Sequence, residues 1–214
     1  MHPRLYLITP PEPEADRLVR DVEAALSGGD VACLLIADDG RGEAAYQALA
    51  ERLVPLGQAA GAAVLLHNDT RVAGRARADG VHVDSGTEDL ERALKTFRPD
   101  GIVGVGDLRG RHDAMTVAEL GVDYVFFGLL ERSADPEPHD KTLKLAGWWT
   151  EVFETPCVAL SGADFAGIET CAATGADFVA VREAVWAHPQ GPQAAVAAAN
   201  EILARFDLAD TEDA

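Results

Sequence analysis

Acidic and amide side chains follow two apolar runs in the first half of the chain. Asn68 and Asp69 come directly after a run that ends in His67, and Asp84 and Asp89 follow the next run. Mg²⁺ suits such positions, because it takes one or two protein carboxylates and leaves its other ligand positions to water and substrate phosphates. Asn and Asp also cap the first turn of a helix. The sequence leaves both interpretations open for Asp69 and Asp89.

A second set of residues could bind phosphate near the end of the chain. Ser161 and Gly162 follow one apolar run, and Arg182 and Glu183 follow the last one. Gly162 lets the backbone approach a ligand closely, and the guanidinium of Arg182 offers a fork of charged donors. Backbone N–H groups at the start of a helix bind phosphate in such loops. A structural turn at Gly162 and an ion pair between Arg182 and Glu183 are the alternatives.

A long polar segment and two histidines complete the candidates. The segment from Gly128 to Asp140 carries Arg132 and leads to Lys141. Long loops of this kind often close over a ligand, although a surface excursion would have the same composition. The imidazoles of His67 and His82 could move a proton, because histidine titrates near neutral pH. We favour the interpretation that both are buried histidines with satisfied hydrogen bonds.

These residues can act together only if the apolar runs form one sheet. Eight short apolar runs alternate with segments of helical period, which is the pattern of repeated βαβ units. Eight similar units favour a single (β/α)8 TIM barrel, in which functional residues gather at the C-terminal ends of the strands. An open, doubly wound sheet is the alternative. The predicted strands are Leu5–Ile8, Val31–Ile36, Ala63–His67, Gly80–Val83, Gly101–Val105, Tyr124–Phe127, Cys157–Leu160 and Phe178–Val181.

The predicted helices lie between these strands and end where the sequence offers a turn. They are Glu14–Ser27, Glu43–Ala60, Thr70–Ala78, Glu88–Thr96, Ala114–Leu120, Thr142–Phe153, Phe165–Thr174 and Pro192–Phe206. Glycine adopts the positive φ that ends a helix, and we expect this at Gly61, Gly121 and Gly175. Three similar segments place an Asp just before a strand: Asp79, Asp123 and Asp177. These positions lie at the structural face of a barrel, so we interpret the three residues as turn formers.

Length and composition limit the remaining possibilities. The chain has 214 residues, so we expect one domain over residues 1–206, followed by an acidic, disordered tail at 207–214. Its 36 acidic and 18 basic residues give a net charge of −18, which argues against nucleic acid as a partner. No apolar run suits a membrane span or a signal peptide, so a cytoplasmic location is expected. The three cysteines have no paired spacing, and we expect buried free thiols.

The order and spacing of these motifs resemble the thiamine phosphate synthase family, which includes thiazole tautomerase relatives. The similarity runs from Leu5 to Leu203. It is carried by Leu5-Tyr-Leu-Ile-Thr9, His67-Asn-Asp-Thr70, Ala78-Asp-Gly-Val-His82, Gly101-Ile-Val-Gly-Val105, Gly121-Val-Asp-Tyr-Val-Phe-Phe-Gly128, Pro156-Cys-Val-Ala-Leu-Ser-Gly162 and Gly175-Ala-Asp-Phe-Val-Ala-Val181. The resemblance implies a TIM barrel that couples a hydroxymethylpyrimidine pyrophosphate to a thiazole phosphate.

The resemblance also implies roles for particular residues. Asp69 and Asp89 would hold Mg²⁺, with Asp84 or Thr87 in place of Asp89 if the loop after Val83 carries no insertion. Asn68 and Lys141 would act on the pyrophosphate as catalytic residues. The phosphate of the thiazole substrate would lie at the seventh and eighth loops, where the matching residues are Ser161, Gly162, Val181 and Arg182.

Three segments depart from the pattern of the family. In the sixth loop, Arg132-Ser-Ala-Asp-Pro-Glu-Pro-His-Asp-Lys141 stands in place of a Thr-rich segment that precedes a Lys. The second strand ends in Leu34-Leu35-Ile36-Ala37-Asp38, where the family has a Gln-Leu-Arg-Glu-Lys-like signature, so an acid replaces two cations. The fifth strand is followed by Gly106-Asp107-Leu108 in place of a Ser-His-Thr-like segment. These departures raise the alternative of a relative that binds a phosphorylated thiazole as a tautomerase, with His67 or His82 moving the proton, or as a non-catalytic sensor.

The oligomeric state is left open by the sequence. Barrels of this kind are often dimeric, and a homodimer is one possible arrangement. The Trp148-Trp149 pair could contribute to such an interface or could pack the sixth helix against the barrel. We favour the packing role.

Overall fold

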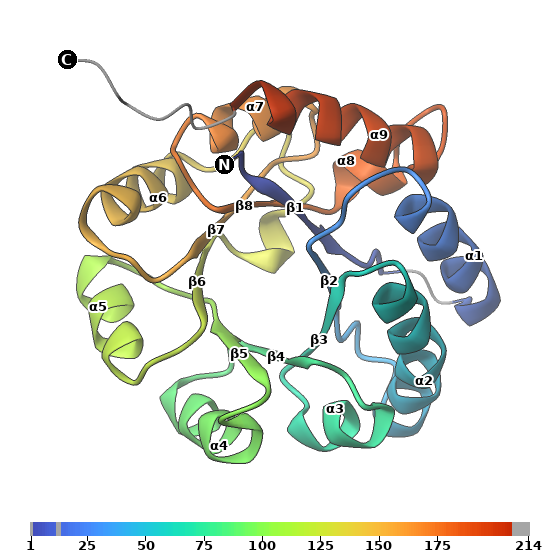
Figure 1. Cartoon of the computed structure of the whole chain (residues 1–214), viewed down its shortest axis with the longest axis horizontal. Helices are drawn as coiled ribbons and strands as arrows, with labels where there is room; N and C mark the ends of the chain where they lie inside the picture. Colours follow the sequence, from blue (N-terminus) through green and yellow to red (C-terminus); the bar gives the residue numbers. More distant parts are fainter. Residues whose placement is uncertain (1, 12–13, 207–214) are drawn as a thin grey trace.

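A closed barrel of eight parallel strands, in the order β1 to β8, forms the centre of the computed structural model, which describes residues 2–11 and 14–206. Figure 1 looks into the barrel and shows the helices as an outer ring. The strands are β1 (Arg4–Ile8), β2 (Cys33–Ile36), β3 (Ala63–His67), β4 (Gly80–Val83), β5 (Ile102–Val105), β6 (Tyr124–Phe127), β7 (Cys157–Leu160) and β8 (Phe178–Val181). The tail predicted at 207–214 lies outside the described residues.

Pairing of the first strand with the last decides between a barrel and an open sheet. Arg4 pairs with Phe178 and Leu7 with Val181, so β1 lies beside β8 in the same parallel sense as every other pair. The predicted (β/α)8 barrel is therefore confirmed, and the doubly wound alternative is excluded. All eight predicted strands are present, although β2 begins two residues later than expected, at Cys33.

The helices follow the predicted order with small shifts at their ends. They are α1 (Ala15–Leu26), α2 (Glu43–Ala59), α3 (Thr70–Ala76), α4 (Thr87–Phe97), α5 (Arg111–Glu119), η1 (Leu130–Arg132), α6 (Asp140–Val152), α7 (Ala166–Ala172), α8 (Glu183–Trp186), α9 (Pro192–Leu203) and η2 (Ala204–Phe206). Helix α5 begins three residues earlier than predicted. Its first turn is polar, so the apolar pattern used to predict the helix is absent there. The four-residue helix α8 was not predicted, since a single turn is too short to show periodicity.

Backbone conformation explains where three of the helices stop. Gly61, Gly121 and Gly175 have φ of 81°, 80° and 82°, as predicted for glycines that follow the end of a helix. Helix α3 instead ends at Ala76, and its C-cap Arg77 has a left-handed φ of 58° although it is not a glycine. The expected extension to Ala78 is therefore wrong, because the chain leaves the helix at Arg77.

Alternate residues of each strand point into the barrel or outward against the helices. The inner cluster includes Tyr6, Leu35, Tyr124 and Phe126, and Leu130 of η1 packs against it. The yellow turn of η1 lies over the barrel opening in Figure 1. Branched aliphatic side chains fill the layer between strands and helices. This packing holds the C-terminal ends of the strands in fixed positions.

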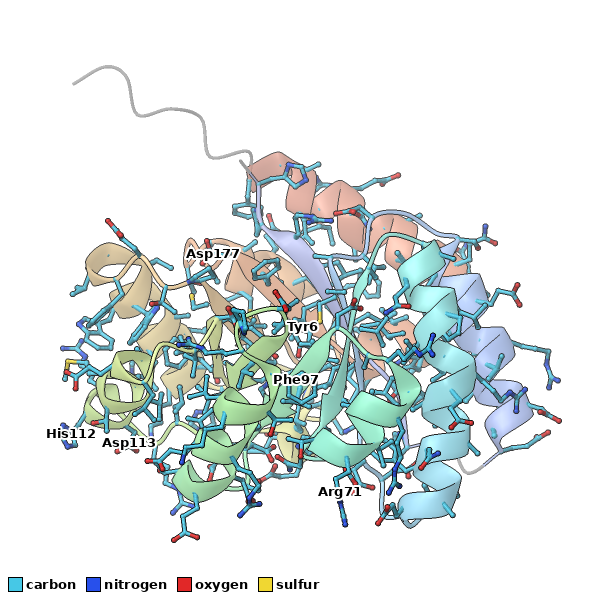
Figure 2. All side chains as sticks on the ribbon, turned by 60° about the horizontal axis from the view of Figure 1, so that its bottom comes forward. Tyr6, Arg71, Phe97, His112, Asp113 and Asp177 are labelled. Carbon is cyan, nitrogen blue, oxygen red and sulfur yellow. The ribbon has the colours of Figure 1, made fainter. Side chains whose placement is uncertain are left out.

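Figure 2 turns the barrel so that its two ends can be compared. Asp177, which precedes β8, lies near one end, whereas Arg71, His112 and Asp113 lie toward the opposite end, where the helices start. Tyr6 lies between them, inside the strand ring. The second end is the one to which the strands point, so the candidate functional residues belong there.

The remaining expectations on the core concern the tryptophans and the cysteines. Trp149 is fully buried, stacks on Phe153 at 4.0 Å between ring centroids, and donates its indole N–H to the carbonyl of Thr155. The packing role is therefore confirmed for this residue. All three cysteines are buried and free, as predicted. None of the helices in the described ranges is long and apolar enough to cross a bilayer.

Candidate functional site

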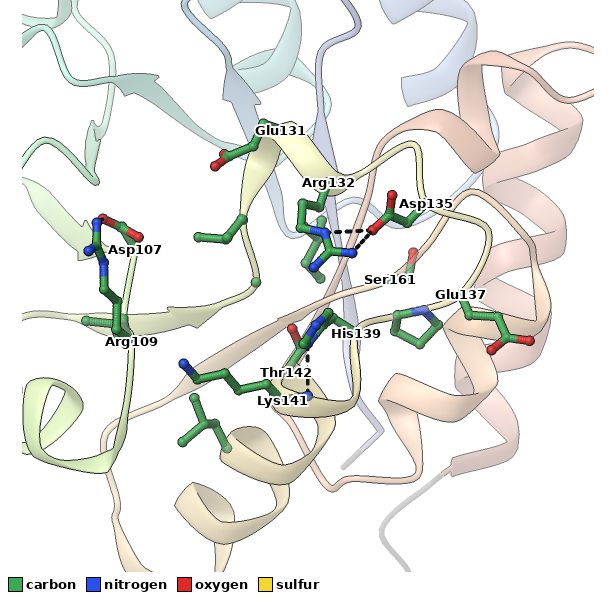
Figure 3. Close-up of a pocket in the computed structure, with 16 residues that line it drawn as sticks. Asp107, Arg109, Glu131, Arg132, Asp135, Glu137, His139, Lys141, Thr142 and Ser161 are labelled. Atoms are coloured by element: carbon green, nitrogen blue, oxygen red, sulfur yellow. Dashed lines mark hydrogen bonds and ion pairs between the residues drawn. The ribbon is translucent and has the colours of Figure 1, made fainter.

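A cavity of about 360 Å³ opens at the C-terminal end of the barrel, between the loop after β5, the loop after β6 and the start of α6. Figure 3 shows charged side chains around it, contributed by segments that are distant in the sequence. The polar residues of its lining are Asp107, Arg109, Glu131, Arg132, Asp135, Glu137, His139, Lys141, Thr142 and Ser161. We call this space the rim cavity. Two predicted site residues, Lys141 and Ser161, lie in its wall.

Three basic side chains face the rim cavity, and they differ in their partners. Arg109 lies 3.3 Å from Asp107, and the Nε of Arg132 donates to Asp135 at 2.7 Å. Lys141 makes no ion pair within the described part of the chain, and its side chain extends along the cavity in Figure 3. Its backbone N–H is capped by the Nδ1 of His139 at 3.1 Å, which fixes the first turn of α6. Lys141 is therefore the cation best placed to meet an anionic ligand.

The predicted amide and one acidic residue meet where β3 and β4 end. Asn68 Nδ2 donates to Asp84 Oδ1 at 2.6 Å, and the backbone N–H of Asp84 donates back to Asn68 Oδ1 at 2.9 Å. His67 Nε2 lies 2.8 Å from the same carboxylate. Burial opposes ionisation of Asp84, but hydrogen bonds from His67 and Asn68 more than offset it and lower the pKa of the carboxyl to about 2. Asp84 is thus ionised at neutral pH, and His67 and Asn68 fix its position.

The two residues expected to bind metal are engaged in other interactions. Asp69 is the N-cap of α3, and its Oδ1 accepts from the backbone N–H groups of Arg71 and Val72 at 3.0 and 2.9 Å. Asp89 lies in the first turn of α4 and pairs with Arg92 at 2.6 Å. The acid that lies beside Asn68 is Asp84, which the sequence had offered only as the alternative to Asp89.

The described residues do not form a complete set of protein ligands for Mg²⁺. Across residues 2–11 and 14–206, no three His, Cys, Asp or Glu side chains are grouped so that they could hold a metal ion. One oxygen of Asp69 already accepts two backbone hydrogen bonds, and Asp84 accepts from two neighbouring side chains. Mg²⁺ needs near-octahedral oxygen ligands, most of which come from water and substrate phosphates, so these residues do not complete a site for it on their own.

The segment between β6 and α6 covers the loop that follows β7. The backbone N–H groups of Ala163 and Asp164 donate to the carbonyls of Asp135 and Pro136 at 2.8 and 3.0 Å. A Cβ added at Gly162 would lie 2.3 Å from the carbonyl oxygen of Pro136, so only glycine allows this approach. Ser161 is buried and donates its hydroxyl to the carbonyl of Gly162. The long segment between β6 and α6 therefore packs directly on the loop after β7 at this point.

The eighth loop places its predicted residues in structural contacts. Arg182 donates its Nε to the carbonyl of Thr9 at 2.9 Å and its Nη1 to that of Leu130 at 3.5 Å. Burial lowers the pKa of this guanidinium from its usual value. Val181 is the last residue of β8, and its side chain is in the outer core. In this arrangement Arg182 ties the end of β1 to η1.

Sequence reasoning passed over one cation near the end of β2. Arg41 donates its Nε to Asp39 at 2.8 Å, and the side chains of this pair are only 12% and 11% exposed. The sequence suggested that acids alone follow this strand. Arg41 could have been found, because it falls in a loop at the C-terminal end of a strand, where functional residues gather.

The structure thus defines a (β/α)8 barrel whose ionisable residues gather in the loops at the C-terminal ends of its strands. A family model described as thiamine monophosphate synthase matches residues 5–185. The chain is 41% identical to the thiamine-phosphate synthase of Rhodospirillum centenum over 94% of its own length and 97% of that protein. It is 35% identical to that of Hyphomonas neptunium, over 94% and 93%. The chain belongs to the thiamine monophosphate synthase family.

Solved structures agree with this assignment at the level of the fold. A thiamine phosphate pyrophosphorylase from Pyrococcus furiosus superposes with a TM-score of 0.79 at 22% identity, covering 95% of this chain and 96% of that one. An orotidine 5′-phosphate decarboxylase from Pyrococcus horikoshii superposes with a TM-score of 0.68 at 14% identity, covering 94% and 99%. At these identities the likeness concerns the barrel alone.

Proposed function

We propose that this protein works in the cytoplasm, in thiamine biosynthesis, as a thiamine-phosphate synthase that binds a thiazole phosphate in the rim cavity and joins it to a hydroxymethylpyrimidine pyrophosphate. The observation that carries the proposal is Lys141, a cation that has no carboxylate partner among the described residues and lines a cavity at the C-terminal end of the barrel. Relatives of similar length that carry this name support the choice of substrates.

Charge in the rim cavity favours one anionic group at Lys141. Arg109 and Arg132 are each neutralised by a neighbouring aspartate, so the ammonium of Lys141 is the group that gains most from a phosphate. Lysine binds phosphate as a point charge. Ser161 lies in the same wall and can contribute its hydroxyl once a ligand competes for it.

A second candidate function is favoured by the residues at β2, β3 and β4. Asp38 and Asp39 follow β2, where Arg41 pairs with Asp39, and the described residues contain no cluster of three metal-binding side chains. A pyrophosphate would meet repulsion there without a metal ion to offset it. The second candidate is therefore a protein that binds the phosphorylated thiazole as a tautomerase or as a non-catalytic sensor, without coupling it to a pyrimidine.

Calorimetry tests the binding of thiazole phosphate, which both candidate functions require. Replacing Lys141 by Ala should weaken binding about ten-fold to a hundred-fold, since a charge-assisted hydrogen bond contributes about 1.5–3 kcal/mol. Lys144→Ala is the matched control, because Lys144 lies on the same helix, is 79% exposed, and pairs only at 3.9 Å with Asp140. Equal affinities of K141A and the unaltered protein would contradict the proposed site.

A coupling assay separates the two candidates. The protein is mixed with both substrates, with Mg²⁺ or with a chelator, and thiamine phosphate and pyrophosphate are measured. Product that depends on Mg²⁺ supports the synthase, and would mean that substrate phosphates complete the metal site. Binding of thiazole phosphate without product under either condition supports the second candidate, and absence of both overturns the two together.

A further inference from the structure

A cavity of about 240 Å³ opens at the end of the barrel opposite to the rim cavity, and we call it the basal cavity. Its lining comes from every strand except β4, and it includes Cys33, Ala63, Ile102 and Phe178, each the first residue of its strand. Figure 2 shows this end by the label of Asp177, which directly precedes Phe178. The basal cavity shares no lining residue with the rim cavity, so it is a separate space.

Three small residues leave this space at the start of the strands. Ala32 precedes β2, Ala63 begins β3 and Gly80 begins β4. Bulky side chains normally fill each layer of a barrel interior, and these three residues add almost no volume to the layer at this end. Ile102 and Phe178 pack against the inner cluster but remain only half-buried. Covering this apolar surface with a ligand is therefore favourable.

Aromatic rings form part of the wall of the basal cavity. Tyr6, Tyr124 and Phe178 line it together with aliphatic side chains. The hydroxyls of Tyr6 and Tyr124 lie 2.8 Å apart, and that of Tyr124 lies 2.9 Å from the Nδ1 of His82, so both are already engaged. The two tyrosines can therefore offer a ligand their ring surface. Aromatic rings pack favourably against one another edge to face or in offset stacks.

The charged groups at the mouth of the basal cavity already have partners. The Nε and Nη2 of Arg4 donate to the carboxylate of Asp30, each at 2.8 Å. Asp123 accepts the backbone N–H of Val103 at 2.7 Å. Burial raises the pKa of the Cys33 thiol, so this side chain is uncharged. A charged ligand would lose its hydration in the cavity without gaining a counter-ion there, whereas a neutral one has no such cost.

We propose that the basal cavity binds a small neutral aromatic molecule, whose ring packs against Tyr124 and Phe178. A dry apolar cavity of about 150 Å³ is enough to hold benzene, so this space accommodates one ring with short substituents. A helix of a partner protein, about 10 Å across, does not fit within it. The site lies at the opposite end of the barrel from Lys141, so the proposal goes beyond the proposed function and does not depend on it.

Titration with benzene and benzoate, followed by NMR of carbon-13-labelled methyl groups, tests both the site and the charge of its ligand. Millimolar benzene should shift the methyl resonances of Leu65, Ile102 and Val158 in a saturable way, because these side chains line the basal cavity. Benzoate has the same ring with a negative charge and should bind at least ten-fold more weakly. Absence of a saturable shift with benzene, or equal affinities for the two molecules, overturns the proposal.

A variant that fills the basal cavity locates the response. Ala63→Leu should abolish the benzene shifts of Ile102 and Val158, because the larger side chain occupies the space. Ala59→Leu is the matched control, since it adds the same side chain at the exposed last residue of α2 and should leave the affinity unchanged. Ala32→Leu, at a second lining position, gives the same test should A63L fail to fold. Unchanged benzene affinity in the filled variant overturns the proposal.

Light scattering distinguishes a small ligand from a second copy of the chain as the occupant. The unaltered protein and A63L should have the same molecular mass. A dimer that dissociates in A63L would show that a second copy covers the basal cavity, which overturns the proposal. Binding of thiazole phosphate near Lys141 is measured separately, so failure at the basal cavity is distinct from failure of the proposed function.

Discussion

Three aspartates have the structural role that their positions indicated. Asp79, Asp123 and Asp177 each stand before a strand and accept the backbone N–H of the preceding strand in the barrel at 2.7, 2.7 and 2.8 Å. The partners are in β3, β5 and β7, so the contact recurs in every second unit. Each carboxylate satisfies a donor at the N-terminal end of the barrel, far from the rim cavity. The structural role is therefore confirmed, although these side chains bond the neighbouring strand rather than their own turn.

Protonation linked to His82 should begin to destabilise the protein at a higher pH than protonation of the carboxylates does. The folded state holds this imidazole neutral down to a pKa of about 3, whereas the unfolded chain takes up a proton near 6.5. The stability that it contributes is complete above about pH 6.5 and is lost as the pH falls toward 3. The expected slope is about 1.4 kcal/mol per pH unit.

Urea unfolding of His82→Gln between about pH 4 and 7 measures this contribution. The variant should be less stable than the unaltered protein at pH 7, and the difference should shrink toward pH 4 because only the unaltered protein loses this stability. His112→Gln is the control, since His112 is exposed at the start of α5. Parallel pH profiles for H82Q and the unaltered protein would show that His82 is not held neutral.

At the scale of elements, the segment between β6 and α6 acts as a cover. It contributes Arg132, Asp135 and Glu137 to the rim cavity, and its carbonyls accept the backbone N–H groups that follow Gly162. The same segment therefore shapes the ligand site and occupies donors of the seventh loop. A ligand that binds to those donors would have to displace it.

Gly162→Ala should loosen this cover. The added Cβ would lie 2.3 Å from the carbonyl oxygen of Pro136, so the backbones must separate at a cost of about 1–3 kcal/mol. Hydrogen exchange at the amides of Ala163 and Asp164 should accelerate at least ten-fold. Gly147→Ala in α6 is the control, because nothing lies within 4 Å of its added Cβ and it should leave both amides unchanged. Unchanged exchange in G162A would mean that the cover does not depend on this contact.

At the scale of the whole molecule, contacts between the two ends of the chain support barrel closure. Trp186 of α8 donates its indole N–H to the carbonyl of Ile8 at 2.7 Å, and Arg182 donates to the carbonyl of Thr9. These bonds join the end of β1 to the segment after β8, alongside the pairing of the two strands. The first strand is therefore held both by its backbone hydrogen bonds to β8 and by side chains from the segment after β8.

Trp186→Phe should lower the stability of the entire barrel. The change keeps an aromatic ring but leaves the carbonyl of Ile8 without this donor, which costs about 1–3 kcal/mol. In a protein of this size, each kcal/mol corresponds to a fall of roughly 2–4 °C in Tm, which calorimetry can measure. Trp148→Phe serves as the comparison, because Trp148 stacks under the guanidinium of Arg111 and should cost less. A larger loss in W148F would contradict the role of Trp186 in closure.

The eight strands, their alternation with helices and the glycines that end three helices could all be predicted from the sequence, whereas closure of the barrel was decided by the pairing of β1 with β8. These features depend on local patterns, since apolar runs of four or five residues, helical period and positive φ are all properties of neighbouring residues. The three structural aspartates could be predicted for the same reason, as each repeats in a similar segment before a strand. Family membership could also be predicted from the order of these motifs.

The use of the polar atoms in the site could not be predicted, because it depends on contacts between distant parts of the chain. Asp84 meets Asn68 across 16 residues, and Arg182 reaches Thr9 across 173. Whether a carboxylate or guanidinium is free for a ligand depends on partners that the chain brings together only on folding. The hydrogen-bond chain from Tyr6 through Tyr124 to the Nδ1 of His82 likewise needs side chains from β1, β6 and β4 inside one closed barrel, and no local pattern in the sequence encodes these contacts.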